Sequence, residues 1–270
     1  MIRRGIVLSF LGHELRDLRT NARVVPLFFI FPILGITFPV AIALLGPSMV
    51  TEASRDPGMM AVLKAATNVI EFQGLDMSDA MTRYMMRAVV GFYLLMPIAV
   101  GSTAAAFSIV GEKQQRTLEP ILATPITDRE FLAGKLMVCL VPTVAVTWLT
   151  GVVAVALVDA VTYVRARELL LPDRFWVVGI GVLAPLLGIA VTLVTMRLSA
   201  RSVDPQATVQ ASALAIIPGF LVIFGLFGRI LIASFPALLV GIGIMIALDF
   251  WLFRLVEKTF EREEILTRWR

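Results

Sequence analysis

The sequence predicts an all-α integral membrane protein that crosses the bilayer about six times. Hydrophobic residues make up 58% of the 270 residues and charged residues only 16%, whereas soluble domains are nearer half apolar and a quarter charged. The apolar residues are also gathered into uncharged runs of about 20, the length that a helix needs to cross a bilayer. We therefore expect one transmembrane domain that occupies residues 1–270.

Six runs have the length and composition of membrane spans. They are residues 24–46, 88–110, 136–158, 176–196, 211–228 and 230–253. The first five contain no charged residue, and the sixth contains only Asp249. Because only Arg229 separates the last two runs, residues 211–253 form either two full spans or a segment with a re-entrant hairpin.

The distribution of Lys and Arg predicts the orientation. If the N-terminus is cytoplasmic, 16 of the 24 Lys and Arg residues fall in cytoplasmic segments and eight in outside segments. Cytoplasmic loops normally carry the excess of these residues. We therefore expect a multi-pass protein of the cell membrane with both termini in the cytoplasm, including a charged tail at residues 254–270.

The segments outside the spans have patterns of their own. Residues 1–23 carry apolar residues on one helical face and charged residues on the other, which predicts an interfacial helix that either anchors the chain or docks a partner. The long outside loop at 47–87 predicts a short helix over residues 59–70 and helix caps at Asp76 and Ser78. This loop serves as a lid or as an external gate.

The cytoplasmic segment 111–130, between the second and third spans, is the most informative for function. It reads as a charged helical turn, a short apolar face, prolines and a new helix. Thr127 and Glu130 have the spacing of a capping box for that new helix. Charge combined with exposed apolar side chains favours a docking element over a solvated linker.

This segment resembles the signature of type-2 ABC transporter permeases, which reads roughly Glu-Lys-Glu-x-x-Thr-Leu-Glu-x-Leu-Leu-x-x-Pro and then Gly-Lys. The matching residues are Glu112, Lys113, Thr117, Leu118, Glu119, Leu122, Pro125, Gly134 and Lys135. Gln114 replaces the second acid, and Pro120 interrupts the turn. The six spans, the amphipathic N-terminal helix and the charged tail also resemble that family.

The resemblance implies a membrane subunit that pairs with a second copy or a homologous permease and with separate ATPase subunits, usually as an exporter. It implies that the segment is a coupling helix that contacts the ATPase, with coupling residues Glu112, Lys113, Arg116, Thr117, Leu118, Glu119, Leu122 and Pro125. It further implies ATPase contacts from the two ends of the chain, at Glu14, Arg16, Glu261 and Arg262.

Small residues at every fourth position let helices pack closely. Ala211, Ala215 and Gly219 follow this pattern and pack either within the chain or between two copies. Lys135, at the start of the third span, is expected to snorkel to the inner surface, with a coupling role as the alternative.

The sequence also predicts that nucleotide binding belongs to another chain and that this chain lacks a Cys- or His-based metal cluster. It has no phosphate-binding G-x-x-x-x-G-K-[ST] motif, so ATP and Mg²⁺ are expected on the partner subunit and no cofactor on this chain. A single cysteine, Cys139, and a single histidine, His13, do not suffice for a Cys- or His-based metal cluster. Arginines that flank apolar runs favour anionic lipid headgroups, not nucleic acid, as their partner.

The main alternative is an ATP-independent secondary transporter or channel. That class places ionisable residues near the middle of the membrane, where Asp249 is the only candidate and lies toward the inner end. Snorkelling or local pairing with Arg254 equally explains this acid. An intramembrane enzyme would need a polar constellation inside the spans, and none is evident. The sparse polar lining favours lipids or amphipathic molecules over small ions as substrate.

Overall fold

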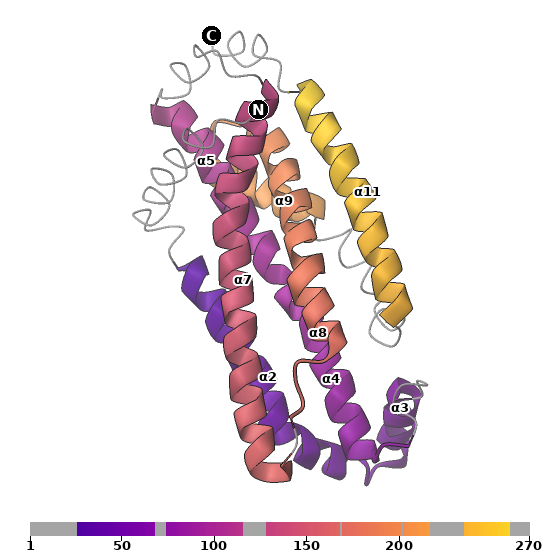
Figure 1. Cartoon of the computed structure of the whole chain (residues 1–270). Coiled ribbons are helices and arrows are strands. Elements are labelled where there is room, and N and C mark those ends of the chain that lie inside the picture. Colours follow the sequence, from indigo (N-terminus) through magenta and orange to yellow (C-terminus); the bar gives the residue numbers. More distant parts are fainter. Residues whose placement is uncertain are drawn as a thin grey trace.

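The protein is an elongated bundle of helices in the computed structural model (Figure 1). The structure describes residues 26–67, 74–115, 128–167, 169–200, 202–216 and 235–259, and these contain helices and connections but no strand. The helical elements are α2 (Leu27–Ala53), α3 (Pro57–Thr67), α4 (Met77–Tyr93), η2 (Pro97–Gly101), α5 (Ser102–Gln115), α7 (Asp128–Ala166), α8 (Arg174–Val178), η3 (Gly179–Leu183), α9 (Ala184–Ser199), a helix over 205–216, and α11 (Phe235–Thr259).

Within the described residues, five helical runs are long and apolar enough to cross a membrane. They are Phe29–Ala53, Met77–Gln114, Arg129–Arg165, Arg174–Ser199 and Phe235–Lys258. They contain most of the first four predicted spans and of the sixth, so the all-α membrane fold is confirmed. Of the predicted fifth span, residues 211–216 are helical and the remainder lies outside the described residues.

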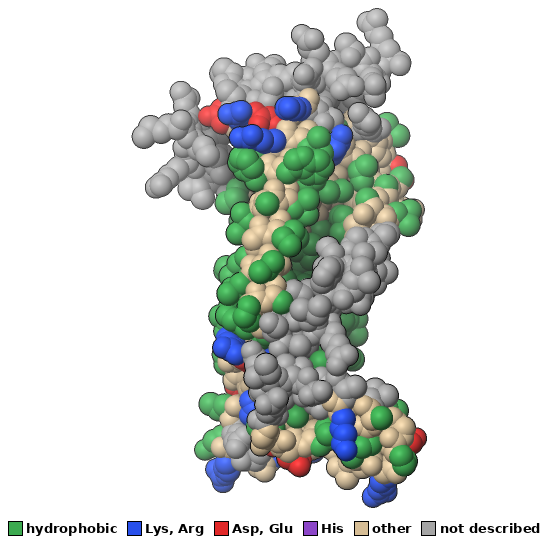
Figure 2. Space-filling view, turned by 90° about the vertical axis from the view of Figure 1, so that its right-hand side faces the viewer, with side chains coloured by type: hydrophobic (Ala, Val, Ile, Leu, Met, Phe, Trp, Pro, Cys, Tyr) green, Lys and Arg blue, Asp and Glu red, His purple; other side chains and the backbone are tan. Residues whose placement is uncertain are grey.

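Several helices are longer than the apolar runs that predicted them. Helix α7 has 39 residues, about 58 Å at 1.5 Å per residue, whereas the hydrocarbon core of a bilayer is about 30 Å thick. Charged side chains gather toward the two ends of the molecule, with mostly apolar side chains between them (Figure 2). The ends of the long helices therefore reach beyond the hydrocarbon region.

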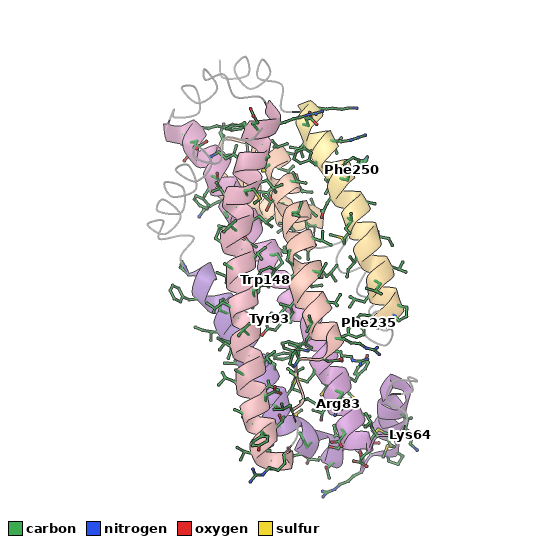
Figure 3. All side chains as sticks on the ribbon, viewed as in Figure 1. Lys64, Arg83, Tyr93, Trp148, Phe235 and Phe250 are labelled. Carbon is green, nitrogen blue, oxygen red and sulfur yellow. The ribbon has the colours of Figure 1, made fainter. Side chains whose placement is uncertain are left out.

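The outer surface of the apolar zone carries large hydrophobic side chains along its length (Figure 3). Trp148 on α7 and Phe250 on α11 are 48% and 60% exposed, which suits a surface that faces lipid or another membrane chain.

Two spans contain short π-helical turns next to prolines. Pro97 begins η2 and Pro185 follows η3 at the start of α9. Proline has no N–H to donate and clashes with the preceding turn, and a wider π turn accommodates both effects. The two π segments are therefore points where these spans depart from a straight α-helix.

The loop between the first two spans folds much as the sequence predicts. Helix α3 corresponds to the short helix expected at 59–70 and packs against α4. Asp76 is the N-cap of α4, and its carboxylate accepts a hydrogen bond of 3.2 Å from the backbone N–H of Ser78. Asp76 is thus a cap as expected, and Ser78 supplies the donor.

Among the described residues, buried side chains form two clusters, one in each half of the bundle. One joins α5, α7, α9 and α11 and includes Ile109, Leu132, Leu193, Met196 and Val256. The other joins α2, α4, α7 and α8 around Tyr93 and Trp176. Helix α7 spans both clusters, and α9 packs on α5, α7 and α11.

Candidate functional site at the ends of α5 and α7

The predicted coupling segment, residues 111–130, begins within α5 and ends within α7. Of its predicted residues, the structure describes Glu112 and Lys113 on α5. The other predicted contacts with partner subunits that lie outside the described residues are Arg116, Thr117, Leu118, Glu119, Leu122, Pro125, Glu14, Arg16, Glu261, Arg262 and Gly219.

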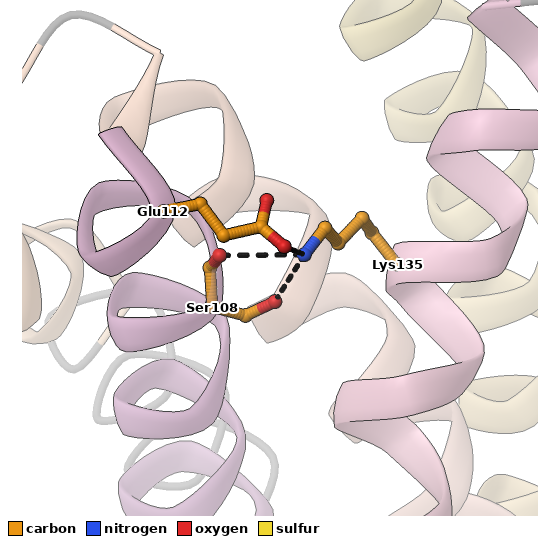
Figure 4. A network of polar contacts seen from close by, with 3 residues as sticks. All are labelled: Ser108, Glu112 and Lys135. Atoms are coloured by element: carbon orange, nitrogen blue, oxygen red, sulfur yellow. Dashed lines mark hydrogen bonds and ion pairs between the residues drawn. The ribbon is translucent and has the colours of Figure 1, made fainter. Parts of the chain in front are cut away.

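Glu112 forms an ion pair with Lys135 across the two ends of this segment. The distance from Glu112 Oε1 to Lys135 Nζ is 2.5 Å, and Lys135 Nζ also donates to Ser108 Oγ at 3.0 Å (Figure 4). Ser108 and Glu112 are four residues apart and therefore lie on one face of α5, toward α7. The helices on both sides of the segment are thus joined directly at its base.

This contact corrects the expected position of Lys135. The side chain of Lys135 is completely buried, and that of Glu112 is 16% exposed. Lys135 therefore does not snorkel to the surface: it crosses to α5, where a carboxylate and a hydroxyl replace water. A buried ammonium is stable only with such partners.

Lys113, the next residue, points to a different helix. Its ammonium donates to the backbone carbonyls of Ser199 and Ala200, both at 2.7 Å, and the residue is 5% exposed. These carbonyls belong to the last turn and C-cap of α9, where a helix has unsatisfied acceptors and a partial negative charge. Consecutive residues of α5 thus bind α7 and α9, because each residue turns about 100° around the helix.

Gln114 extends the contact with the segment after α9. Its side-chain amide donates to the carbonyl of Val203 at 2.9 Å. A glutamate, the residue of the resembling family's pattern, has no proton to donate when ionised. The departure from that pattern therefore has a structural explanation: this position faces a backbone acceptor.

A further ion pair joins α7 to α11. Arg129 Nε, in the first turn of α7, contacts Glu257 Oε1 near the end of α11. Arg129 is largely exposed, so we expect this pair to contribute little to stability. Together with the apolar cluster below them, these contacts hold the ends of α5, α7, α9 and α11 at the base of residues 116–127.

The remaining predicted residues that the structure describes do not belong to this junction. Ala211 and Ala215 lie exposed on the helix over residues 205–216. Asp249 is buried in α11, and neither of its carboxylate oxygens has a hydrogen-bond partner among the described residues. The local pairing with Arg254 is not formed, because the Arg254 guanidinium stacks over the Phe250 ring, 4.4 Å from its centroid.

The buried partners at this site could be predicted only in part. Glu112, Lys113 and Lys135 belong to the recognisable motif, but their partners are separated from them in sequence. Nothing in the sequence connects Lys113 to backbone carbonyls 86 residues further on. Ser108 was not among the predicted residues; its spacing of four residues from Glu112 places both on one face of a helix but does not indicate which helix they face.

Comparison with known proteins places these elements in one family. The family model described as ABC-2 family transporter protein matches residues 57–205, more than half of the 270-residue chain. The matched range runs from α3 through α9 and includes Glu112, Lys113 and Lys135. No curated protein matches the chain. The chain therefore belongs to the ABC-2 family of transporter proteins and is a membrane subunit of an ABC transporter.

Proposed function

We propose that the chain forms the substrate pathway of an exporter of the cell membrane and is driven by a separate ATPase through residues 111–130. In this arrangement ATP and Mg²⁺ bind the ATPase, and both termini of this chain are cytoplasmic. The observation that carries the proposal is the junction at the base of the coupling segment. The segment connects two helices whose ends are already tied together by Glu112 and Lys135.

The junction supports a coupling role because it connects the segment mechanically to several helices. A force on residues 116–127 acts on α5 and α7 together, since their ends are joined on both sides of the segment. Lys113 passes the displacement to α9 through the carbonyls of Ser199 and Ala200. Three spans then respond to one contact with the ATPase.

The middle of the bundle offers a place for the spans to bend. Following α5 and α9 away from the junction leads to the π segments η2 and η3. π turns and proline interrupt the regular hydrogen-bond ladder of a helix and are common sites of kinks. Because the helix ends are joined and the middles can bend, a displacement of the junction would change the substrate pathway.

We assign the predicted coupling residues two roles. Glu112 and Lys113 face this chain's own helices, so they transmit motion and leave docking to other residues. Docking on the ATPase then falls to Arg116, Thr117, Leu118, Glu119, Leu122 and Pro125, with Glu14, Arg16, Glu261 and Arg262 as additional contacts. Two membrane subunits pair in the complete transporter, and Ala211, Ala215 and Gly219 remain the proposed packing stripe.

Two variants separate docking from transmission. The chain is co-purified with a candidate ATP-binding cassette ATPase of the same organism, and both assembly and the stimulation of ATPase activity are measured. We expect Leu118→Asp to weaken assembly about tenfold or more, because it places a charge in an apolar contact. We expect Lys113→Met to assemble normally and to lose several-fold of the stimulation.

A control variant and two contradicting outcomes test the docking role and the transmission role separately. Arg254→Gln removes a positive charge at the same end of the bundle, from a side chain outside the junction, and is expected to behave as the wild type. Normal assembly of Leu118→Asp would contradict the docking role. Normal stimulation with Lys113→Met would contradict transmission through α9.

One observation favours the alternative of an ATP-independent transporter. Asp249 is buried within a spanning helix without a partner among the described residues, and such acids often bind ions or protons. Proton- or sodium-driven flux in vesicles that contain this chain and no ATPase, abolished by Asp249→Asn, would support that alternative. Absence of flux until the ATPase is added would support the exporter.

A further inference from the structure

A cavity of about 310 Å³ lies between α9, the helix over residues 205–216 and α11. Its lining residues are Val194, Arg197, Leu198, Ala215, Leu252 and Val256. All of these except Arg197 are apolar. The volume is at the lower end of the range for ligand pockets, roughly 300–1,000 Å³, so the cavity suits one hydrocarbon chain and not a large polar solute.

Arg197 gives the cavity its chemical specificity. It is half-buried in the last turn of α9 and has no hydrogen bond or ion pair within the described part of the chain. Three other cations at this end behave differently, since Lys113, Arg129 and Lys135 each bind a carbonyl or a carboxylate, and the exposed Arg254 stacks over the Phe250 ring. The guanidinium of Arg197 thus keeps a planar set of donors that matches a phosphate group.

The depth of the cavity favours a lipid. Arg197 is two residues before Ser199, whose carbonyl accepts from Lys113 at the junction. The guanidinium therefore lies at the end of the apolar zone, at headgroup level, and Leu252 and Val194 extend the apolar lining toward the bilayer interior. A charge at the rim above an apolar slot complements an amphiphile with an anionic head.

We propose that the cavity between α9 and α11 binds an anionic phospholipid of the bilayer, with its phosphate at Arg197 and one acyl chain along Leu252 and Val194. A soluble anion would leave the apolar lining unfilled, and a neutral amphiphile would leave the guanidinium unpaired. Asp249 lies three residues before Leu252 on α11 but does not line the cavity. Only the assignment of this end to the cytoplasmic leaflet rests on the proposed function.

The test measures lipid retention by the full-length chain alone. The purified protein in neutral detergent is titrated with phosphatidylglycerol or phosphatidylcholine, and bound lipids are counted by native mass spectrometry. We expect one phosphatidylglycerol to bind about tenfold or more tightly than phosphatidylcholine, because the choline ammonium of phosphatidylcholine offsets the charge of its phosphate and repels the guanidinium. We expect Arg197→Gln to remove this preference and Arg254→Gln, which removes an exposed charge on the same end of the bundle, to retain it.

A second variant tests the apolar half of the site. Ala215→Trp, on the exposed side of the cavity, is expected to fill the slot and to lower phosphatidylglycerol binding while Arg197 remains. Size-exclusion chromatography and circular dichroism check that both variants are folded. Equal binding of the two lipids by the wild type, or unchanged binding by Arg197→Gln or by a folded Ala215→Trp, would overturn the proposal.

Adding the ATPase distinguishes a resident lipid from cargo. We expect phosphatidylglycerol to remain bound during ATP turnover, as a structural lipid would. Its release or movement to the other leaflet during turnover would overturn the assignment as a resident lipid and place the cavity on the substrate pathway. Because the binding measurements contain no ATPase, they can succeed or fail independently of the coupling proposal.

Discussion

The two ends of the bundle are held together by different side chains. At the junction end, lysines bind a carboxylate or helix carbonyls. In the other half of the bundle, which we call the aromatic end, Trp176 Nε1 donates to the Met86 carbonyl at 2.9 Å, Tyr93 Oη donates to the Gly35 carbonyl at 2.7 Å, and the two rings form an edge-to-face pair with centroids 5.4 Å apart. The aromatic end also has charged contacts, such as Arg87 Nε with Asp173 Oδ2 at 2.9 Å, but it adds a pair of rigid aromatic rings, whereas the polar contacts of the junction come from flexible charged chains.

This difference corresponds to different mechanical demands. An aromatic side chain has two rotatable bonds and fixes the distance between the elements that it joins. A lysine has a flexible four-carbon stem and a compact charge, so it keeps its contact when the helices shift. We infer that the aromatic end fixes the bundle while the junction end remains joined as it moves. The predictions below test this contrast, from the largest expected effect to the smallest.

Removing the buried ammonium at the junction is expected to have the largest effect on stability. Lys135→Met removes the ammonium that pairs with the largely buried carboxylate of Glu112, and the loss of one member of a buried ion pair typically costs about 3–5 kcal/mol. Thermal denaturation in detergent micelles measures the loss. Exchange of the two charges, in the double variant Glu112→Lys with Lys135→Glu, is expected to restore much of it. A single variant as stable as the wild type would contradict the importance of the pair.

Loss of the Lys113 contacts is expected to be smaller and local. Lys113→Met removes two hydrogen bonds from an ammonium to the end of α9, each of a kind worth about 1.5–3 kcal/mol when charged. Methionine retains most of the apolar stem, so the packing is largely conserved. Hydrogen exchange should increase in the last turn of α9 and remain unchanged in α4. Equal increases in both helices would indicate general destabilisation.

The aromatic end offers the matching test. Tyr93→Phe preserves the ring and its edge-to-face contact with Trp176 but removes the hydrogen bond to the Gly35 carbonyl. We expect a loss of about 1 kcal/mol, visible as a small decrease in thermal stability. Stimulation of the partner ATPase should be unchanged, because Tyr93 lies outside the junction. A loss of stimulation without a loss of assembly would show that motion also depends on this end.

The apolar runs were sufficient to predict the spans, because lipid requires long uncharged helices. They did not predict how far α4 and α7 extend, since charged residues such as Arg129 and Arg165 continue a helix once it has left the hydrocarbon region. Segment 111–130 identified the candidate site but not the orientation of Lys135. Whether a lysine snorkels or is buried depends on the neighbouring helix, and the carboxylate that decides this belongs to an element 23 residues away.

The smallest predicted effect concerns Gln114. Gln114→Glu makes the segment more similar to the family signature, yet it replaces an amide that donates to the Val203 carbonyl by a carboxylate that only accepts. The side chain is exposed, so water can take over the lost contact and we expect a change of about 1 kcal/mol or less. Hydrogen exchange at 202–204 should increase slightly, with Gln114→Ala as the control that removes the donor without adding charge. Stronger protection in Gln114→Glu would contradict the contact, because only a donor at this position can hold a backbone carbonyl.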